Sequence, residues 1–301
     1  MNRQELSEHL VTLRDYVRFA ASRFMEAGLF FGHGTAGPLD EAAALVLHSL
    51  HLPYDLPGGY FEARLTPAER ESVLVLILRR IEERVPLAYL THEAPFAGLS
   101  FYVDERVLVP RSPIAELIEQ RFSPWLEAEA VIDVLDLCTG SGCIAIACAF
   151  AFPEARVDAV DISVEALEVA STNVRRHELE DRVALLESDI FSGLAGKRYD
   201  LIVSNPPYVN AEEWQSLPKE FHAEPRLGLE SGKDGLDCVR RILAGAAEHL
   251  KPDGILVVEV GSAAEALVQS FPDVPFCWLE FEHGGDGVFL LTGEQVRRYL
   301  S

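Results

Sequence analysis

The sequence contains few cysteines and none of the paired spacings that bind zinc. Its five cysteines are an odd number in a chain of 301 residues. Three of them, Cys138, Cys143 and Cys148, stand five residues apart. Two CxxC pairs, the usual signature of a structural zinc site, do not occur. The sequence therefore indicates neither a metal site nor a framework of disulfide bonds.

Long hydrophobic segments are also missing. The longest purely apolar run, Cys143 to Phe152, is too short to span a bilayer, which takes about 20 residues of helix. The N-terminal segment carries scattered charges and no apolar centre, unlike a signal peptide. We therefore expect a soluble, cytoplasmic protein with no membrane partner.

Basic residues are in the minority. The chain has 26 lysines and arginines against 48 acidic residues, which gives a formal net charge of −22. Proteins that bind duplex DNA neutralise its phosphates with a positive surface, so direct DNA binding is disfavoured. A basic protein partner would be attracted instead. The alternative is that the negative charge serves only to keep the protein soluble.

The hydrophobic pattern changes twice along the chain, and a chain of this length usually forms two domains. Residues 1–94 show helical spacing, and Thr66–Pro67 followed by Glu69 predicts a capped helix start. Residues 95–112 have a period of two, which predicts a β-hairpin linker. Residues 113–301 form the third predicted segment, which begins with a helix.

In this third segment, apolar strands alternate with helices. Such alternation is typical of an α/β fold in which helices cover both faces of a mostly parallel sheet. Strands that are buried on both sides are apolar throughout, as Leu201–Val203 is. We predict helices at 114–122, 143–152, 164–179 and 235–250, and seven strands at 131–137, 156–162, 183–190, 199–205, 255–261, 276–282 and 288–292.

A glycine-rich turn, Asp136–Gly142, joins the first of these strands to its helix. In an open α/β sheet, ligands bind at the carboxyl ends of the strands, where glycines let the backbone approach them and a helix start provides free N–H groups. Gly140-x-Gly142-x-x-Ala145 also fits the dinucleotide fingerprint, with Asp161 at the distance of its ribose-binding acid. Alone, the turn does not choose between cofactors.

Three acidic residues favour S-adenosylmethionine as the cofactor. Asp136 lies inside the turn, shortly before the glycines, where it would repel a pyrophosphate but can pair with a cationic amino-acid group. Asp161 suits two ribose hydroxyls and Asp189 an adenine amino group, although both residues could instead cap the segments that follow them. The candidate cofactor-binding residues are Asp136, Thr139, Gly140, Ser141, Gly142, Asp161, Ile162, Asp189, Ile190 and Asn205.

The fourth predicted strand ends in Asn205-Pro206-Pro207-Tyr208, the candidate catalytic loop. Two prolines after a buried strand end its hydrogen bonding and stiffen the backbone, and Pro206 holds Asn205 extended. The loop would present two acceptors, the Asn205 side-chain oxygen and the Pro206 carbonyl, beside the ring of Tyr208. The alternative is a proline-rich turn with a buried tyrosine.

This arrangement suits an NH2 group on a planar system. An amide nitrogen is a poor nucleophile because its lone pair is delocalised. Accepting both of its hydrogens would polarise the group and aim the nitrogen at a sulfonium methyl, while Tyr208 stacks on the planar target. The loop therefore predicts methylation of an amide or amine nitrogen.

These motifs resemble the HemK-type protein glutamine methyltransferases, and the resemblance covers essentially the whole chain. It implies a class I, Rossmann-like methyltransferase domain with seven strands, a helical amino-terminal domain that recognises the substrate, a connecting β-hairpin, and transfer to a glutamine side-chain amide. The segments that carry the resemblance are Asp136–Gly142, Val160–Asp161, Ser188–Asp189, Ser204–Tyr208, Glu224–Pro225, Gly232–Gly235 and Glu259–Gly261.

Further segments indicate a branch of this family. Release-factor enzymes carry Pro-Arg-Pro-x-Thr-Glu after the hairpin, whereas Val109–Glu116 of this chain reads VPRSPIAE. This segment, Phe31–Thr35, Phe101–Val109 and Gly284–Gly287 are similar to the branch that modifies large-subunit ribosomal protein three, free or within an assembling subunit. We expect that substrate, with release factors as the alternative. Arg111 either positions the substrate backbone or forms a structural salt bridge.

Three other functions are alternatives to this one. A DNA adenine amino methyltransferase would use the same loop but would need a positive groove. A dehydrogenase would share the glycine turn but has no use for Asn-Pro-Pro-Tyr. A non-catalytic binding module would keep its cellular function after loss of the Asn205 side chain.

Overall fold

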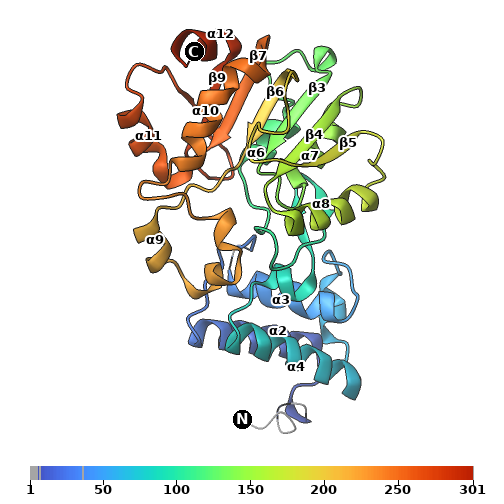
Figure 1. Cartoon of the computed structure of the whole chain (residues 1–301). Coiled ribbons are helices and arrows are strands. Elements are labelled where there is room, and N and C mark those ends of the chain that lie inside the picture. Colours follow the sequence, from blue (N-terminus) through green and yellow to red (C-terminus); the bar gives the residue numbers. More distant parts are fainter. Residues whose placement is uncertain (1–5, 7, 36, 301) are drawn as a thin grey trace. The chain divides into compact units, whose positions relative to one another are not determined.

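The structure, a computed structural model, describes residues 6, 8–35 and 37–300. The chain divides into two compact units, Met1–Glu93 with Pro218–Ala223, and Ala94–Leu217 with Glu224–Ser301. Figure 1 shows the helices of the first unit and the sheet of the second. Positions 1–5, 7, 36 and 301 of the predicted domains lie outside the described residues. Residues 218–223 cluster with the helical unit, whereas the predicted division places them in 113–301.

The first unit packs its helices around a hydrophobic core that includes Tyr16, Phe24 and Leu74. Helix α4 begins as predicted: the Thr66 hydroxyl accepts a hydrogen bond from the Glu69 N–H, and the Glu69 carboxylate accepts one from the Thr66 N–H. The helices are α2 (Leu13–Glu26), α3 (Pro38–Ser49), α4 (Pro67–Glu82) and α5 (Leu87–Thr91), with 3-10 turns η1 (Gly58–Glu62) and η3 (Lys219–Ala223).

A buried ion-pair cluster anchors residues 218–223 in this unit. Arg80 is 1% exposed, and it donates to Glu41 at 2.6 Å and to Glu220 at 3.4 Å. Glu220 also accepts from Arg84 at 3.2 Å and from the Phe30 N–H at 3.2 Å. Removing one partner of a buried pair leaves a costly unpaired charge. Glu220 therefore ties a distant segment of the chain to the helical unit.

The second unit contains a seven-stranded sheet, which confirms the predicted α/β class. Its order is β5-β4-β3-β6-β7-β9-β8. Neighbouring strands from β5 to β7 are parallel, whereas β9 runs antiparallel to both of its neighbours, β7 and β8. The strands are β3 (Asp133–Leu137), β4 (Arg156–Asp161), β5 (Val183–Glu187), β6 (Tyr199–Ser204), β7 (Leu250–Glu259), β8 (Cys277–Trp278) and β9 (Val288–Thr292).

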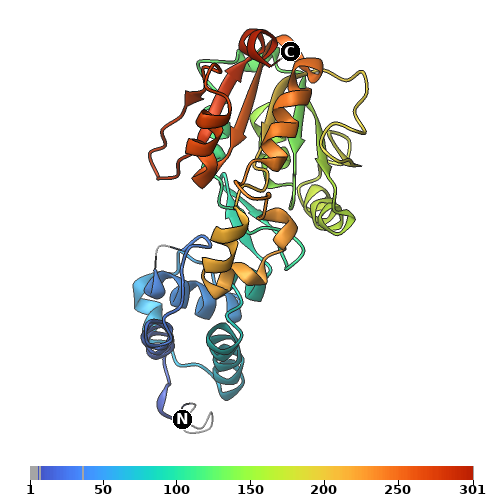
Figure 2. The ribbon, with the colours of Figure 1, turned by 60° about the vertical axis from the view of Figure 1, so that its left-hand side comes forward.

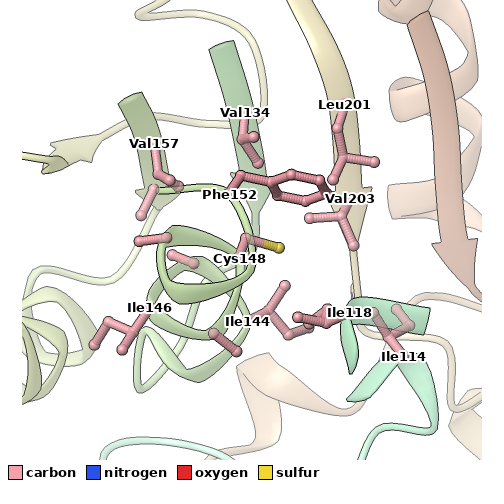
Figure 3. Close-up of a cluster of buried hydrophobic side chains, with 14 of the residues drawn as sticks. Ile114, Ile118, Val134, Ile144, Ile146, Cys148, Phe152, Val157, Leu201 and Val203 are labelled. Atoms are coloured by element: carbon pink, nitrogen blue, oxygen red, sulfur yellow. The ribbon is translucent and has the colours of Figure 1, made fainter. Parts of the chain in front are cut away.

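Helices cover both faces of this sheet. One face carries α6 (Ile114–Glu119), α7 (Cys143–Ala151) and α8 (Val164–Arg176), and the other carries α10 (Asp237–His249), α11 (Ala264–Ser270) and α12 (Gly293–Tyr299). Figure 2 shows α10 (orange) lying along the strands. Figure 3 shows Phe152, just after α7, among Val134 of β3 and Leu201 and Val203 of β6. In the described part of the chain, no helix is both long and apolar enough to cross a membrane.

Several predicted elements are shorter in the structure. The hairpin consists of β1 (Ala94–Phe96) and β2 (Leu99–Phe101), so its predicted extension to residue 112 is wrong. Residues 102–113 form no strand, and the Val109 N–H donates to the Glu224 carboxylate at 2.9 Å instead of to a strand. Helix α6 ends at Glu119, and β8 has only two residues. The remaining elements are η2 (Ala128–Ala130), α9 (Ala211–Ser216), η4 (Arg226–Gly228) and η5 (Gly261–Ala263).

Candidate active site

A cavity of about 340 Å³ opens at the carboxyl ends of β3, β4 and β6 in the second unit. The strand order changes direction between β3 and β6, and ligands of open α/β sheets bind at such a switch point. The predicted site residues that line the cavity are Arg111, Thr139, Gly140, Ser141, Asp161, Ile162, Asp189, Ile190, Asn205 and Pro207. Those outside its wall are Asp136, Gly142, Pro206 and Tyr208.

The turn after β3 adopts a backbone conformation that favours glycine. Gly140 has φ +54° and Gly142 has φ +80°. A Cβ atom on Gly142 would also lie 3.2 Å from the Cβ of Ala170 in α8. The Gly140 N–H donates to the Asp161 carboxylate at 2.9 Å, which links the ends of β3 and β4. The glycines thus allow the turn to pack closely beside the cavity.

Asp136 lies beneath this turn and is fully buried. Its Oδ2 atom accepts from the Thr139 hydroxyl at 2.5 Å and from the Ala145 N–H at 3.1 Å. Its Oδ1 atom is buried and has no hydrogen-bond partner among the described residues. Burial raises the pKa of Asp136 to about 7. Because a buried, unsatisfied oxygen is costly, this position fits a ligand that brings a positive charge or a donor.

The other two acidic residues line the cavity and already have protein partners. Asp161 accepts from the N–H groups of Gly140 at 2.9 Å and Ser163 at 3.0 Å, so it does cap the segment that follows it. Asp189 accepts from Arg241 at 2.6 Å. The exposed side chain of Ile162 and the buried one of Ile190 supply apolar surface next to these carboxylates.

Asn205 follows the last residue of β6, and its neighbour Ser204 donates to the Leu137 carbonyl at 2.8 Å. Asn205 is one of the residues that line the cavity, and its carboxamide forms no hydrogen bond with the described part of the chain. Pro206 is buried, and Pro207 contributes to the cavity wall. The oxygen and the NH2 group of this carboxamide are therefore available to form hydrogen bonds with a ligand.

Tyr208 is placed differently from the rest of the loop. Its hydroxyl donates to Glu259 at 2.9 Å, and its ring packs on Gly261, where a Cβ atom would lie 2.5 Å from the Tyr208 Cε2 atom. Burial is the main cause of the raised pKa of Tyr208. The ring therefore supports the loop from outside the cavity wall, a contact that the sequence does not predict.

Arg111 forms the structural salt bridge that was one of its two expected roles. Its guanidinium donates to both carboxylate oxygens of Glu224, at 2.6 Å and 2.9 Å. Arg111 also lines the cavity, so it holds the strap before α6 (residues 109–112) against the loop that contains Glu224. Glu224 belongs to the Glu224–Pro225 motif, for which the sequence alone indicates no role. Nothing in the sequence singled out Arg241, or Cys238, whose sulfur lies 3.9 Å from that of Cys138.

Two relatives from Neisseria meningitidis, of serogroups A and B, are each 53% identical to this chain over 294 residues. The alignments cover 97% of this chain and 96% of each relative, and both relatives are named ribosomal protein uL3 glutamine methyltransferase. This chain belongs to the HemK-type protein glutamine methyltransferases. Within it, residues 122–232 match the methyltransferase small domain family.

The methyltransferase also shares its fold with solved structures. The catalytic domain of hMettl16, in complex with MAT2A 3′UTR hairpin 6, is 17% identical, with a TM-score of 0.51. That similarity covers 74% of this chain and 80% of the other. The enzyme is a protein glutamine N-methyltransferase that uses S-adenosylmethionine.

Proposed function

We propose that this methyltransferase modifies the side-chain amide nitrogen of a glutamine in large-subunit ribosomal protein uL3. The relatives named for that substrate support the proposal. So does Val109–Glu116, which departs from the release-factor pattern. The observation that carries the chemistry is the unengaged Asn205 carboxamide in the wall of the cavity at the end of β6.

The catalytic loop acts by holding the substrate amide. The Asn205 side-chain oxygen and the Pro206 carbonyl accept the two amide hydrogens, and Pro206 and Pro207 keep these acceptors rigid. Holding the nitrogen in a reactive orientation contributes on the order of 7–11 kcal/mol in well-oriented reactions. Stacking of Tyr208 on the substrate stays a prediction, since its ring packs on Gly261.

The cofactor supplies a methyl group on a positively charged sulfur atom. Thr139, Gly140 and Ser141 line the cavity and would hold its amino-acid end, with Gly142 and Asp136 just outside that wall. The Asp136 Oδ1 atom, which has no partner among the described residues, would match its ammonium group. Asp161 retains lone pairs that would accept from the ribose hydroxyls, and Ile162 and Ile190 would provide apolar surface for the adenine. Asp189 is paired with Arg241 and would also accept from the adenine amino group.

The helical domain, residues 1–94, recognises the protein substrate. Residues 95–112, which include the hairpin and the strap, connect this domain to the methyltransferase domain, residues 113–301. Segment 218–223 acts with the helical domain, because Glu220 is anchored there. The net charge of −22 suits a basic ribosomal protein, free or in an assembling subunit, and does not suit DNA. The enzyme works in the cytoplasm.

Methyl transfer to candidate acceptors tests this proposal. Purified enzyme is mixed with radiolabelled S-adenosylmethionine and with ribosomal protein uL3, a release factor or duplex DNA. We expect label in uL3, located on a glutamine by mass spectrometry, and none with Asn205→Ala. Label only in the release factor would overturn the substrate, and label only in DNA would overturn the reaction class.

A further inference from the structure

Glu259 ends β7, next to the strand end from which the catalytic loop emerges. β6 and β7 run parallel with Ser204 opposite Val258, so Glu259 is level with the start of the loop. The side chain is buried, and the residue is 5% exposed. It lies outside the wall of the cavity. A buried carboxylate in this place requires hydrogen-bond partners.

Two hydroxyl groups provide these partners. The Tyr208 hydroxyl donates to one carboxylate oxygen at 2.9 Å, and the Ser112 hydroxyl donates to the other at 2.5 Å. Ser112 in turn accepts from the Ile114 N–H at 3.2 Å, at the start of α6. Since Ser112 also lines the cavity, one carboxylate connects the catalytic loop to the strap on the cavity wall.

Two glycines shape the space that Tyr208 occupies. Gly261, with φ +42°, lies against the ring, and a Cβ atom there would clash with it. Gly235, with φ +77°, lies against the Tyr208 carbonyl, and a Cβ atom there would collide with the oxygen. The ring and the backbone of Tyr208 are thus both confined, and the hydrogen bond to Glu259 fixes the remaining end of the side chain.

We propose that Glu259 is a positioning residue for methyl transfer. It holds Tyr208, and through it the Asn205 and Pro206 acceptors, in a fixed place relative to the strap that lines the cavity. It touches neither substrate nor cofactor, and no bond forms or breaks at its carboxylate. This inference rests on the proposed role of the catalytic loop.

The ionised form of Glu259 accepts both hydrogen bonds, so protonation would remove one acceptor. Burial raises the pKa of Glu259 and Asp286 adds to the rise, whereas the Ser112 and Tyr208 hydroxyls and the charge of Arg111 oppose it. The net direction is upward. As pH falls through this raised pKa, kcat should therefore decrease.

Substitutions at Glu259 separate positioning from a purely structural role. We expect Glu259→Ala to lower kcat on the order of 10²-fold, the cost of misplacing a reacting group, while the Kd for S-adenosylmethionine stays within about twofold. Glu259→Gln keeps one acceptor, so its kcat should lie within about tenfold of wild type, and the acid limb of its pH profile should vanish. Tyr208→Phe combined with Glu259→Ala should be no slower than Glu259→Ala alone, because both remove the same contact.

Glu213→Gln is the matched control, since this nearby carboxylate accepts from Ser262 and Asn210 and not from Tyr208. It should keep the wild-type kcat and acid limb. Wild-type kcat in Glu259→Ala, or an unchanged acid limb in Glu259→Gln, would overturn the proposal.

The test does not depend on the folding of Glu259→Ala. If that variant does not fold, Glu259→Gln and Tyr208→Phe decide, and wild-type kcat in both variants overturns the proposal. If the wild type methylates no glutamine, the proposed function fails; crystal structures then test Glu259 separately, and an unmoved Tyr208 ring in Glu259→Ala or Glu259→Gln overturns its role.

Discussion

Asn205 differs from the acidic side chains of the cavity wall in having no hydrogen-bond partner for its side chain among the residues that the structure describes. Asp161 is held by two backbone N–H groups, and Asp189 is paired with Arg241. The Asn205 carboxamide forms no hydrogen bond within the described residues, although it follows a rigidly paired strand. An acceptor that is fixed by its backbone but unused by the protein is preorganised for a substrate.

Replacing this acceptor should slow the chemistry and leave the cofactor bound. We expect Asn205→Ala to lower kcat by about 10²–10³-fold, comparable to the loss of one preorganised hydrogen-bonding group in other active sites. The Kd for S-adenosylmethionine, measured by calorimetry, should change much less. Asn210→Ala removes the α9 N-cap outside the cavity wall and is the control, with an expected wild-type kcat. Equal rates for Asn205→Ala and wild type would contradict the role of Asn205.

Asp136 should make the stability of the cofactor-free enzyme depend on pH. Its pKa rises from an ordinary value of 3.8 to about 7 on folding. Between these values the unfolded chain has released a proton that the folded chain keeps, so the free energy of unfolding falls as pH increases. The slope is at most about 1.4 kcal/mol per pH unit, and Asp136→Asn should remove this contribution. Urea denaturation at pH 5 and pH 7 measures the free energy of unfolding of the wild type and of Asp136→Asn. If this free energy changes equally with pH in both proteins, the prediction is wrong.

Site residues next to the end of a strand can be predicted from the local sequence. The glycine turn and Asn205 can be recognised because each follows an apolar strand directly. The network of Ser112, Tyr208 and Glu259 could not be predicted, because its members come from three distant segments that meet only after the sheet forms. The partner of Asp189 lies 52 residues away in α10, for the same reason.

Helix α4 shows how a local signal stabilises an element. Thr66 and Glu69 exchange hydrogen bonds at its start. We expect Thr66→Ala to lower the free energy of unfolding by about 1 kcal/mol, the usual cost of losing an N-cap. Ser72→Ala is the control, because the exposed Ser72 hydroxyl bonds back to the Ala68 carbonyl in the helix interior, where alanine is well tolerated. Urea denaturation should show a loss only for Thr66→Ala, and equal stabilities would show that the cap contributes nothing.

Predictions for whole elements succeed where periodicity and burial agree. The strands β3 to β7 and β9 occur where apolar runs predict them. The prediction of the hairpin is wrong beyond Phe101. The apolar residues Val107 and Val109 are buried there without forming a strand, and the Val109 N–H donates to Glu224. The return of residues 218–223 to the helical unit also has no local signal, since it depends on Arg80 and Glu220, which are far apart in the chain.

The charge of the whole molecule bears on how the substrate arrives. A net charge of −22 attracts a basic protein over a distance that shortens as salt is added, because the Debye length is about 10 Å at 0.1 M. We expect the KM for uL3 to rise with ionic strength while the Kd for S-adenosylmethionine changes little. Steady-state kinetics over a salt series checks this. If the KM does not depend on salt, the negative charge does not attract the substrate and serves only solubility.

A crystal structure of the enzyme with S-adenosylhomocysteine and a glutamine-containing uL3 segment tests the central claim most directly. We predict that the Asn205 side-chain oxygen and the Pro206 carbonyl both lie within hydrogen-bonding distance of the substrate amide nitrogen, which faces the cofactor sulfur. A glutamine bound in the cavity with its amide nitrogen turned away from both acceptors would contradict it.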